Sequence, residues 1–171
     1  VTQLGAPTFG VGVTSTSTST IYVGNLYEIE GTRRTNNIYL GSTRVAAQTG
    51  TEIDFYHNDH LGSTNVITDA TGQARSLTEY EPFGKISRFE KYGTKINNTW
   101  AFFNSKLFDE ESGLYYYGAR YYDPKLGRFI TPDTIVQAPS NPQTLNRYTY
   151  CNNNPVNLID PTGRYAVGGG L

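Results

Sequence analysis

The chain has 171 residues, of which 37% are hydrophobic and 13% aromatic, so it is long enough for one domain with a real core. Its formal net charge of -1, with acidic and basic residues interspersed, offers no basic surface to nucleic acid or to anionic lipid. Among the aromatic residues 14 are tyrosines, and the 18 glycines favour strands joined by tight turns. We therefore expect an all-β protein without nucleic-acid partners, and no apolar run reaches membrane-spanning length.

Residues 1–20 run into an alternation of threonine and serine that suits either a leading strand or a linker. The chain starts at Val1 and contains no methionine, which we interpret as the mark of a fragment or a processed piece. Cys151 is the single cysteine, so an intramolecular disulfide is excluded and we expect a buried small hydrophobic side chain there.

Short strand-like runs follow one another from Ile21 to Tyr56, and a glycine separates each run from the next. A further turn is expected between Asp69 and Gly72, because aspartate and glycine supply turn chemistry between two extended runs. This spacing predicts successive antiparallel hairpins over residues 21–84.

The segment from Leu114 to Tyr122 is the strongest strand signal, since aromatic residues occupy almost every position. As one continuous strand it would bury on one face Tyr115, Tyr117 and Tyr121. The opposite face, which we expect to be partly covered, would carry Tyr116 and Tyr122. Six X-Pro steps follow between residues 123 and 161, so the C-terminal part is expected to be an irregular plug with at most short helical turns.

Several ordered motifs resemble those of the YD-repeat (Rhs) family. They are HNDHLGST at 57–64, YEPFG at 80–84, GLYYYGARYYDP at 113–124, GRF at 127–129, NRY at 146–148, NNP at 153–155 and DPTG at 160–163. The resemblance covers residues 21–164 and identifies residues 85–164 as the core region that follows the repeats. It implies a β-sheet that spirals into a hollow shell, capped by the core beside a variable C-terminal effector that is often a toxin. It also implies secretion or surface display of a bacterial type.

A short strip of such hairpins cannot bury two aromatic faces alone, because repeat units need neighbours to stack against. We therefore expect partners. These are upstream repeats and a C-terminal effector of the same polypeptide, or identical copies in a homo-oligomer or extracellular fibre. A weaker alternative is a carbohydrate-binding surface built from exposed tyrosines.

His57, Asp59 and His60 are ligand types for a metal ion. In an extended strand, however, His57 and Asp59 share one face while His60 points to the other. We therefore assign them to structural hydrogen bonding and predict neither a metal nor a cofactor. The glycines at 168–170 lack the lysine and helix of a phosphate loop, so residues 165–171 are expected to be a flexible tail.

The resemblance also implies a candidate active site. In Rhs proteins that cut themselves, two aspartates form the autoprotease pair with an arginine nearby, and the matching positions are Asp133, Asp160 and Arg128. Two carboxyl groups at close range raise the pKa of one of them, and such a pair can activate water. The alternative is that both aspartates only cap turns, which is ordinary Asp-Pro and Asp-Thr chemistry.

Two positions depart from the self-cleaving pattern, since Arg164 stands where a hydrophobic residue is usual and Thr134 where proline is usual. If the pair is active, we expect cleavage in the tail after Gly163, and the end of the chain at Leu171 would be a product of that cleavage. The chain would then be a single-turnover aspartyl autoprotease and not a metabolic enzyme.

Overall fold

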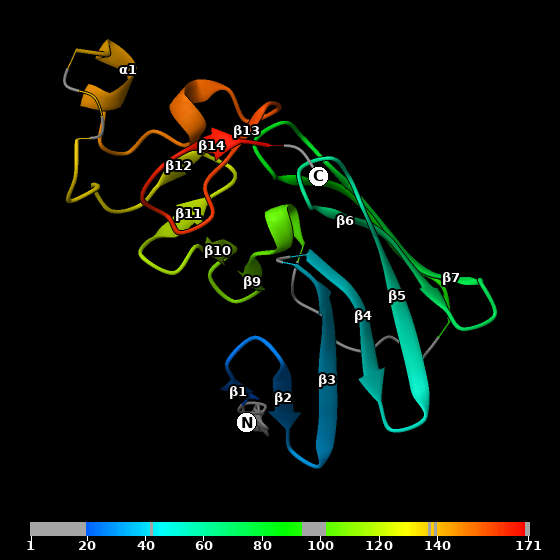
Figure 1. Ribbon diagram of the computed structural model, residues 1–171. Coiled ribbons are helices and arrows are strands. Elements are labelled where there is room, and N and C mark those ends of the chain that lie inside the picture. The colour runs from blue at the N-terminus through cyan, green and yellow to red at the C-terminus, as the bar shows by residue number, and fades with distance from the viewer. Residues whose placement is uncertain (1–19, 42, 94–101, 137, 139, 170–171) are drawn as a thin grey trace, which may run out of the picture.

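The computed structural model describes residues 20–41, 43–93, 102–136, 138 and 140–169. These residues form an eight-stranded sheet, a four-stranded sheet and a two-stranded pair, all antiparallel, with only short helical turns (Figure 1). The all-β class predicted from the sequence is confirmed. Apart from Thr20, the leading segment 1–20 lies outside the described residues.

The eight-stranded sheet, here called the repeat sheet, is a meander in which each strand pairs with the next along the chain. Its strands are β1 (Thr20–Val23), β2 (Tyr27–Glu30), β3 (Arg33–Leu40), β4 (Thr43–Thr49), β5 (Glu52–Asn58), β6 (Thr64–Asp69), β7 (Ala74–Tyr80) and β8 (Ile86–Lys91). Glycines with positive φ make its tight turns, as at Gly31 and Gly50, where a side chain would be strained.

The Asp69 turn forms as predicted, because the Asp69 carboxylate accepts hydrogen bonds from the backbone N–H groups of Thr71 and Gln73. Two boundaries differ from expectation. The run from Ile21 to Ile29 is divided at Gly24 into β1 and β2. Strand β8, which the motifs placed in the core region, is the eighth strand of the repeat sheet.

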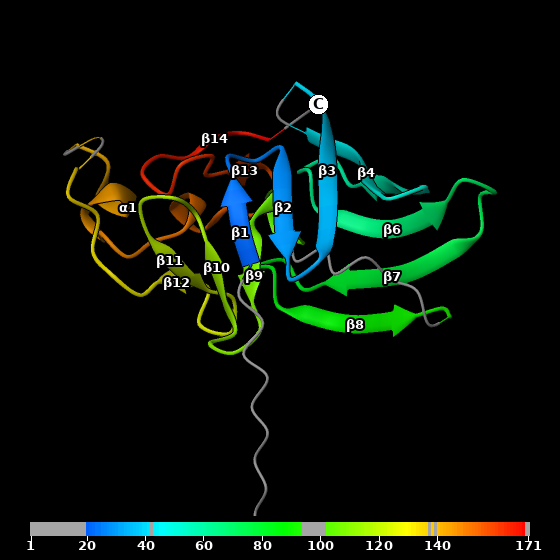
Figure 2. The same cartoon turned by 90° about the horizontal axis from the view of Figure 1, so that it is seen from below.

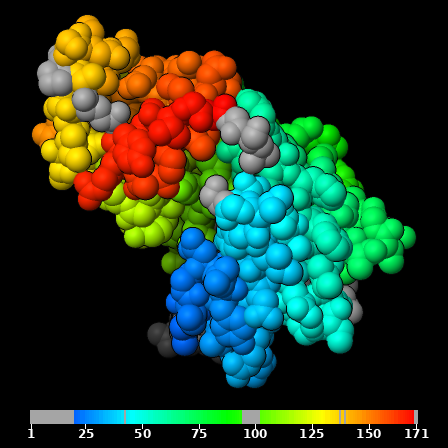
Figure 3. All heavy atoms as spheres, viewed as in Figure 1, coloured from blue at the N-terminus to red at the C-terminus, as the bar shows by residue number. Residues whose placement is uncertain are grey.

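The described residues between 102 and 169, here called the core lobe, gather at one end of the repeat sheet (Figures 2 and 3). The elements of this lobe are η1 (Phe103–Ser105), β9 (Leu107–Asp109), β10 (Leu114–Tyr116), β11 (Tyr121–Asp123), β12 (Arg128–Phe129), α1 (Pro142–Leu145), η2 (Cys151–Asn153), β13 (Leu158–Ile159) and β14 (Val167–Gly168). Among the described residues, none of the helices combines the length and hydrophobicity that a bilayer span requires.

The tyrosine-rich segment is a hairpin and not the single strand expected from its sequence. Strands β10 and β11 pair antiparallel, with Tyr116 opposite Tyr121. The turn between them is closed by a hydrogen bond from the Tyr117 N–H to the Arg120 carbonyl, and Gly118 has a φ of +87°. The turn resets the alternation of faces, so the second half of the motif presents the other residues to the core.

Tyrosine burial follows this hairpin. Tyr115 and Tyr117 are 0% and 1% exposed, as predicted, and Tyr122 is also fully buried. Tyr121 and Tyr116 are each 44% exposed and form a cross-strand ring pair on the outer face. The prediction was therefore wrong for Tyr121 and Tyr122, because it continued one strand through Gly118.

The core of the lobe is aromatic and consists of Phe102, Phe103, Tyr115, Tyr117, Tyr122, Phe129, Tyr150 and Cys151. Burial of each large apolar side chain contributes roughly 1.5–3 kcal/mol. The hydroxyl groups of the core tyrosines are hydrogen-bonded, for example from Tyr115 to the Gly84 carbonyl and from Tyr122 to the Phe83 carbonyl. Cys151 is buried and unpaired, as expected, and burial raises the pKa of its thiol to about 12.

Residues 165–169, the described part of the C-terminal segment, do not form the flexible tail expected from its glycines. Strand β14 pairs with β13 so that Val167 lies opposite Ile159, and the Gly169 N–H donates to the Asn157 carbonyl. A Cβ atom at Gly169 would lie 2.4 Å from a methyl group of Leu61, so this end of the chain packs closely against the repeat sheet. Composition alone missed this, because the packing depends on partners far away in the sequence.

Candidate functional site

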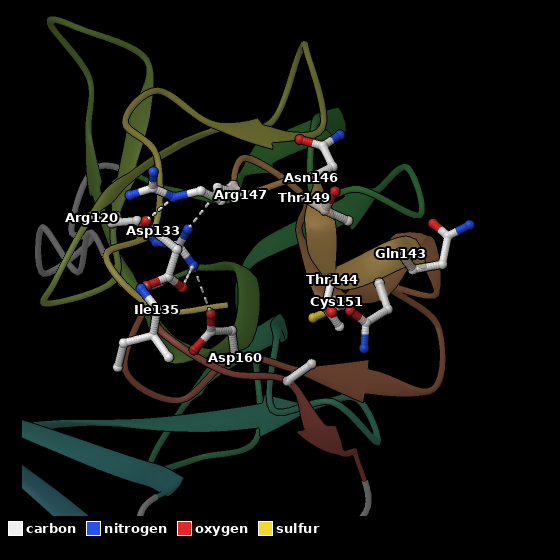
Figure 4. A pocket seen from close by; sticks show the side chains of 12 residues that line it. Arg120, Asp133, Ile135, Gln143, Thr144, Asn146, Arg147, Thr149, Cys151 and Asp160 are labelled. Carbon is white, nitrogen blue, oxygen red and sulfur yellow. Dashed lines mark hydrogen bonds and ion pairs between the residues drawn. The ribbon is translucent and has the colours of Figure 1, made fainter. Parts of the chain in front are cut away.

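Arg120 joins the two candidate aspartates. It lies at the end of the β10–β11 turn and is buried, with one nitrogen, Nη2, 3.1 Å from Asp133 Oδ2 and 3.6 Å from Asp160 Oδ2 (Figure 4). A single guanidinium nitrogen therefore contacts both carboxylates. The core lobe brings the two predicted aspartates together by placing them on one shared cation.

The other nitrogens of Arg120 are also bound. Nε donates to the Gly163 carbonyl oxygen at 2.5 Å, and Nη1 donates to the Arg147 carbonyl at 2.9 Å. The guanidinium carbon lies 3.6 Å from the centre of the Phe129 ring. A planar group held by several acceptors and a ring face has little freedom, so Arg120 is a fixed cation at this site.

The carboxylate of Asp160 organises the turn that follows it. Its Oδ1 accepts backbone N–H groups at 2.7–3.3 Å, those of Thr162, Gly163, Arg164 and Tyr165. Burial raises the pKa of Asp160 above its ordinary value, while these N–H groups and Arg120 act in the opposite direction. The protonated form of Asp160 is therefore more accessible than that of an exposed aspartate.

A side chain at Gly163 would be strained and crowded in this turn. Its φ is +74°, and a Cβ atom would lie 3.0 Å from both the Cβ and the carbonyl oxygen of Tyr117. The Gly163 backbone therefore packs closely against the β10–β11 turn. At the end of this turn, Arg120 donates a hydrogen bond to the Gly163 carbonyl oxygen.

Asp133 is buried on the other side of Arg120 and anchors a loop. Its Oδ1 accepts the N–H of Ile135, and its own N–H donates to the Arg147 carbonyl at 2.8 Å. The Arg147 side chain in turn donates to the Asp133 carbonyl. These bonds close the neck of the loop that carries α1.

One peptide bond, Gly163–Arg164, is contacted on both of its polar atoms. Arg120 Nε binds its carbonyl oxygen, and Asp160 Oδ1 lies 3.1 Å from its nitrogen. Arg120, Asp133 and Asp160 also border a cavity of about 20 Å³, which is room for about one water molecule (Figure 4). An acid, a carbonyl-binding cation and a water-sized space are the parts that peptide hydrolysis needs.

Arg128, the arginine that the resemblance indicated, lies elsewhere. It is exposed on β12, where its backbone pairs with Asp123 and bridges to Thr149. The cation that contacts both carboxylates is Arg120 instead. The signal that could have found it is Gly118 between two aromatic runs, since a hairpin there turns Arg120 inward.

The two positions that depart from the self-cleaving pattern contact each other. Arg164 and Thr134 are both exposed, and Arg164 Nη1 donates to Thr134 Oγ1 at 3.0 Å. The unusual residue after Gly163 is thus held on the surface by the unusual residue after Asp133.

The His57, Asp59 and His60 side chains each hold a separate hydrogen bond. His57 bonds Thr68 Oγ1, and His60 bonds the Val156 carbonyl. Asp59 Oδ1 accepts the N–H groups of the turn residues Leu61 and Ser63. Within the part of the chain that the structure describes, no group of histidine, cysteine and acidic side chains converges as a metal site would require.

The chain also matches a known protein family. The Teneurin YD-shell profile matches residues 42–156. The chain belongs to this family. The YD-repeat (Rhs-type) identification is confirmed, and the chain is a YD-shell module of the Rhs and Tc-toxin type.

Relatives of this YD-shell module are much longer than the chain. Salivary gland surface protein 1 of Aedes aegypti is 40% identical over 116 residues, 66% of this chain and 3% of that protein. The tRNA(Glu)-specific nuclease WapA of Bacillus subtilis subsp. natto is 35% identical over 111 residues, 65% of this chain and 5% of that protein. Toxin protein Tse5 of Pseudomonas aeruginosa is 33% identical over 125 residues, 72% of this chain and 8% of that protein.

Solved structures share the fold. The crystal structure of TcdB2-TccC3-Cdc42 aligns with a TM-score of 0.65 at 26% identity, covering 85% of this chain and 8% of the other. That of TcdB2-TccC3-TEV aligns with a TM-score of 0.67, covering 84% of this chain and 8% of the other. The chain therefore spans only a small part of the length of these solved chains.

Proposed function

We propose that this YD-shell module closes the shell of a longer secreted or surface polypeptide and cuts that polypeptide once, at the Gly163–Arg164 bond. The observation that carries the proposal is the position of Arg120, which contacts the carbonyl oxygen of that bond and both aspartates. Toxin protein Tse5 and toxin subunit YenC1 are among its relatives, which supports an effector of toxin type beyond the cut.

The proposed reaction is a hydrolysis in which Asp133 is the base and Asp160 the acid. Asp133 takes a proton from a water molecule, and the water oxygen bonds to the Gly163 carbonyl carbon. Arg120 stabilises the negative charge that forms on the carbonyl oxygen. Asp160 gives its proton to the Arg164 nitrogen as the C–N bond breaks. The products are a carboxyl group on Gly163 and an amino group on Arg164.

The assignment of roles follows the contacts. Asp160 touches the departing nitrogen and has a raised pKa because of burial, which suits an acid. Asp133 pairs with Arg120 at the shorter of the two distances and borders the cavity, a position that suits a base. The two aspartates thereby exchange protonation states in one turnover.

The experiment uses the chain extended past Leu171 by a folded reporter domain. We expect the parent to release the reporter, whereas Asp133→Asn, Asp160→Asn and Arg120→Met retain it. Lys125→Met, an exposed lysine of the same lobe, serves as the matched control. An Arg128→Met arm separates the two arginines. Equal release of the reporter by the parent and both aspartate variants would mean that the two aspartates only cap turns.

A second candidate function, a self-assembling fibre, is favoured by the edge strand β1. Its residues are uncharged, and Ile21 and Val23 are 58% and 57% exposed. The opposite edge strand, β8, carries an ion pair between Arg88 and Glu90, and charge protects an edge from pairing. Strands of preceding repeats or of identical copies would suit the β1 edge.

Light scattering on concentrated protein distinguishes identical copies from preceding repeats as the partner of the β1 edge. If copies pair at β1, the parent forms oligomers and Val23→Lys restores a monomer, while Ser87→Lys on β8 has no effect. A parent that stays monomeric at high concentration argues for preceding repeats of the same polypeptide.

Carbohydrate binding stays a prediction. Its stacking surface would be the exposed ring pair of Tyr116 and Tyr121.

A further inference from the structure

Lys106 is a second cation at the Asp160 turn. It follows η1, is half-buried, and donates a hydrogen bond from Nζ to the carbonyl oxygen of Pro161, the residue after Asp160. The same Nζ lies 5.1 Å from the centre of the Tyr117 ring. The ammonium group therefore fixes the backbone of the Asp160 turn from a separate segment of the chain.

That segment, residues 102–106, is bound to the β5–β6 turn of the repeat sheet and the start of β6. The Thr64 N–H donates to the Phe102 carbonyl at 3.0 Å. The Asn104 side chain donates to the Leu61 carbonyl at 3.0 Å, and the Ser105 hydroxyl donates to the Gly62 carbonyl at 2.8 Å. Lys106 is thus at the end of a connection between the repeat sheet and the Asp160 turn.

The connection also depends on an unusual backbone. Asn104 and Ser105 have φ angles of +50° and +56°, a region that costs free energy for residues with side chains. Their bonds to Leu61 and Gly62 hold this conformation, and it directs the following residue, Lys106, to Pro161. Without the folded repeat turn, the chain would lose the contacts that maintain the geometry of residues 102–106.

We propose that Lys106 is a positioning residue of the self-cleavage site, holding the Asp160 turn through the Pro161 carbonyl and making the site depend on the folded repeat sheet. The inference rests on the proposed function for its consequence in cleavage. The contact by which Lys106 fixes the Asp160 turn can be measured separately from cleavage. Cleavage before the repeats have folded would release the effector from an unfinished shell, and this dependence prevents it.

The electrostatic consequence has a defined sign. The charged and titratable groups around Asp160 are Arg120, Asp133, Cys151, Arg164 and Lys106. Burial lowers the pKa of Lys106, and the negative charge of Asp160 raises it. Because coupling between two charges is mutual, removing the ammonium group should raise the pKa of Asp160.

The test measures Asp160 by carboxyl-carbon NMR titration of the 171-residue chain, beside the pH profile of reporter release from the extended chain. Lys106→Met should move the Asp160 midpoint upward by about half a pH unit or more and slow release several-fold. Lys106→Arg should restore both, and Lys125→Met is the matched control. A Lys106→Gln variant, which keeps a donor without the charge, should show the midpoint shift with a smaller loss of rate.

Two results decide separate questions. If Lys106→Met and Lys125→Met give the same Asp160 midpoint and the same pH profile, the positioning role is wrong. If the midpoint shifts in Lys106→Met but the parent releases no reporter at any pH, Lys106 holds the Asp160 turn as proposed and the self-cleavage function is wrong. A merely structural role would change stability without shifting the Asp160 midpoint or being rescued by arginine.

Discussion

Arg120 Nη2 and Asp133 Oδ2 lie 3.1 Å apart, and both side chains are 6% exposed, so this ion pair is inside the core lobe. Loss of one partner from a buried pair leaves the other charge without compensation. The pair is therefore part of the fold as well as of the candidate site, and changes to it should affect both stability and cleavage.

Arg120→Met should lower the free energy of unfolding by about 3–5 kcal/mol, because two buried carboxylates lose their shared cation. Chemical denaturation of parent and variant measures this loss. The exposed Arg88→Met provides the control, since surface ion pairs contribute little. Equal stability of Arg120→Met and Arg88→Met would mean that the buried pair does not hold the lobe together.

Gly163→Ala should unfold or distort the Asp160 turn, at a cost of about 1–3 kcal/mol or more. The added methyl group would lie 3.0 Å from two atoms of Tyr117, in a backbone conformation that alanine rarely adopts. Gly168→Ala is a matched control because a Cβ atom there meets nothing within 4 Å. The measurements are denaturation midpoint and reporter release, and the prediction is wrong if the two variants behave alike.

Asp160 should make the stability of the core lobe depend on pH. Its folded pKa lies above the ordinary value of 3.8, because of burial, so it binds its proton more tightly when folded. That stabilisation is complete below pH 3.8 and is lost as the pH rises through the folded pKa. The stability difference between the parent and Asp160→Asn should therefore fall across this window. A difference that grows with pH would contradict the raised pKa.

Tyr122→Ala should cost about 3–5 kcal/mol, whereas Tyr121→Ala should change stability much less. Tyr122 is fully buried among Tyr115, Tyr117 and Tyr150, while Tyr121 is on the outer face. Thermal or chemical denaturation of the two neighbouring variants tests the hairpin directly. If Tyr121→Ala cost more stability than Tyr122→Ala, the segment would be the single strand that the alternation alone suggests.

The repeat sheet was predictable because its signals are local. Glycines between short β-prone runs specify turns wherever they occur, and Asp69 caps its turn with its own side chain. The β10–β11 hairpin was not predictable from the sequence. Tyrosines fill both of its strands, so the alternation of core-facing and outward-facing residues continues through Gly118 without a change of pattern. One turn glycine inside an aromatic run reversed the burial of Tyr121 and Tyr122.

The candidate site was predictable in part. The motifs indicated Asp133 and Asp160, and the structure places both on Arg120. The sequence indicated Arg128 and not Arg120, because the contact of Arg120 with both aspartates depends on segments far apart in the chain. Lys106 could not be found from the sequence either, since its partner is a backbone carbonyl 55 residues away, and backbone groups leave no mark on residue type.

The most direct test of the account is the mass of the fragments released from the extended chain in water enriched in oxygen-18. Hydrolysis by Asp133 and Asp160 predicts one fragment that ends at Gly163 with a single heavy oxygen in its new carboxyl group, and a second that begins at Arg164. No release, a cut at another bond, or a Gly163 end without the heavy oxygen would contradict it.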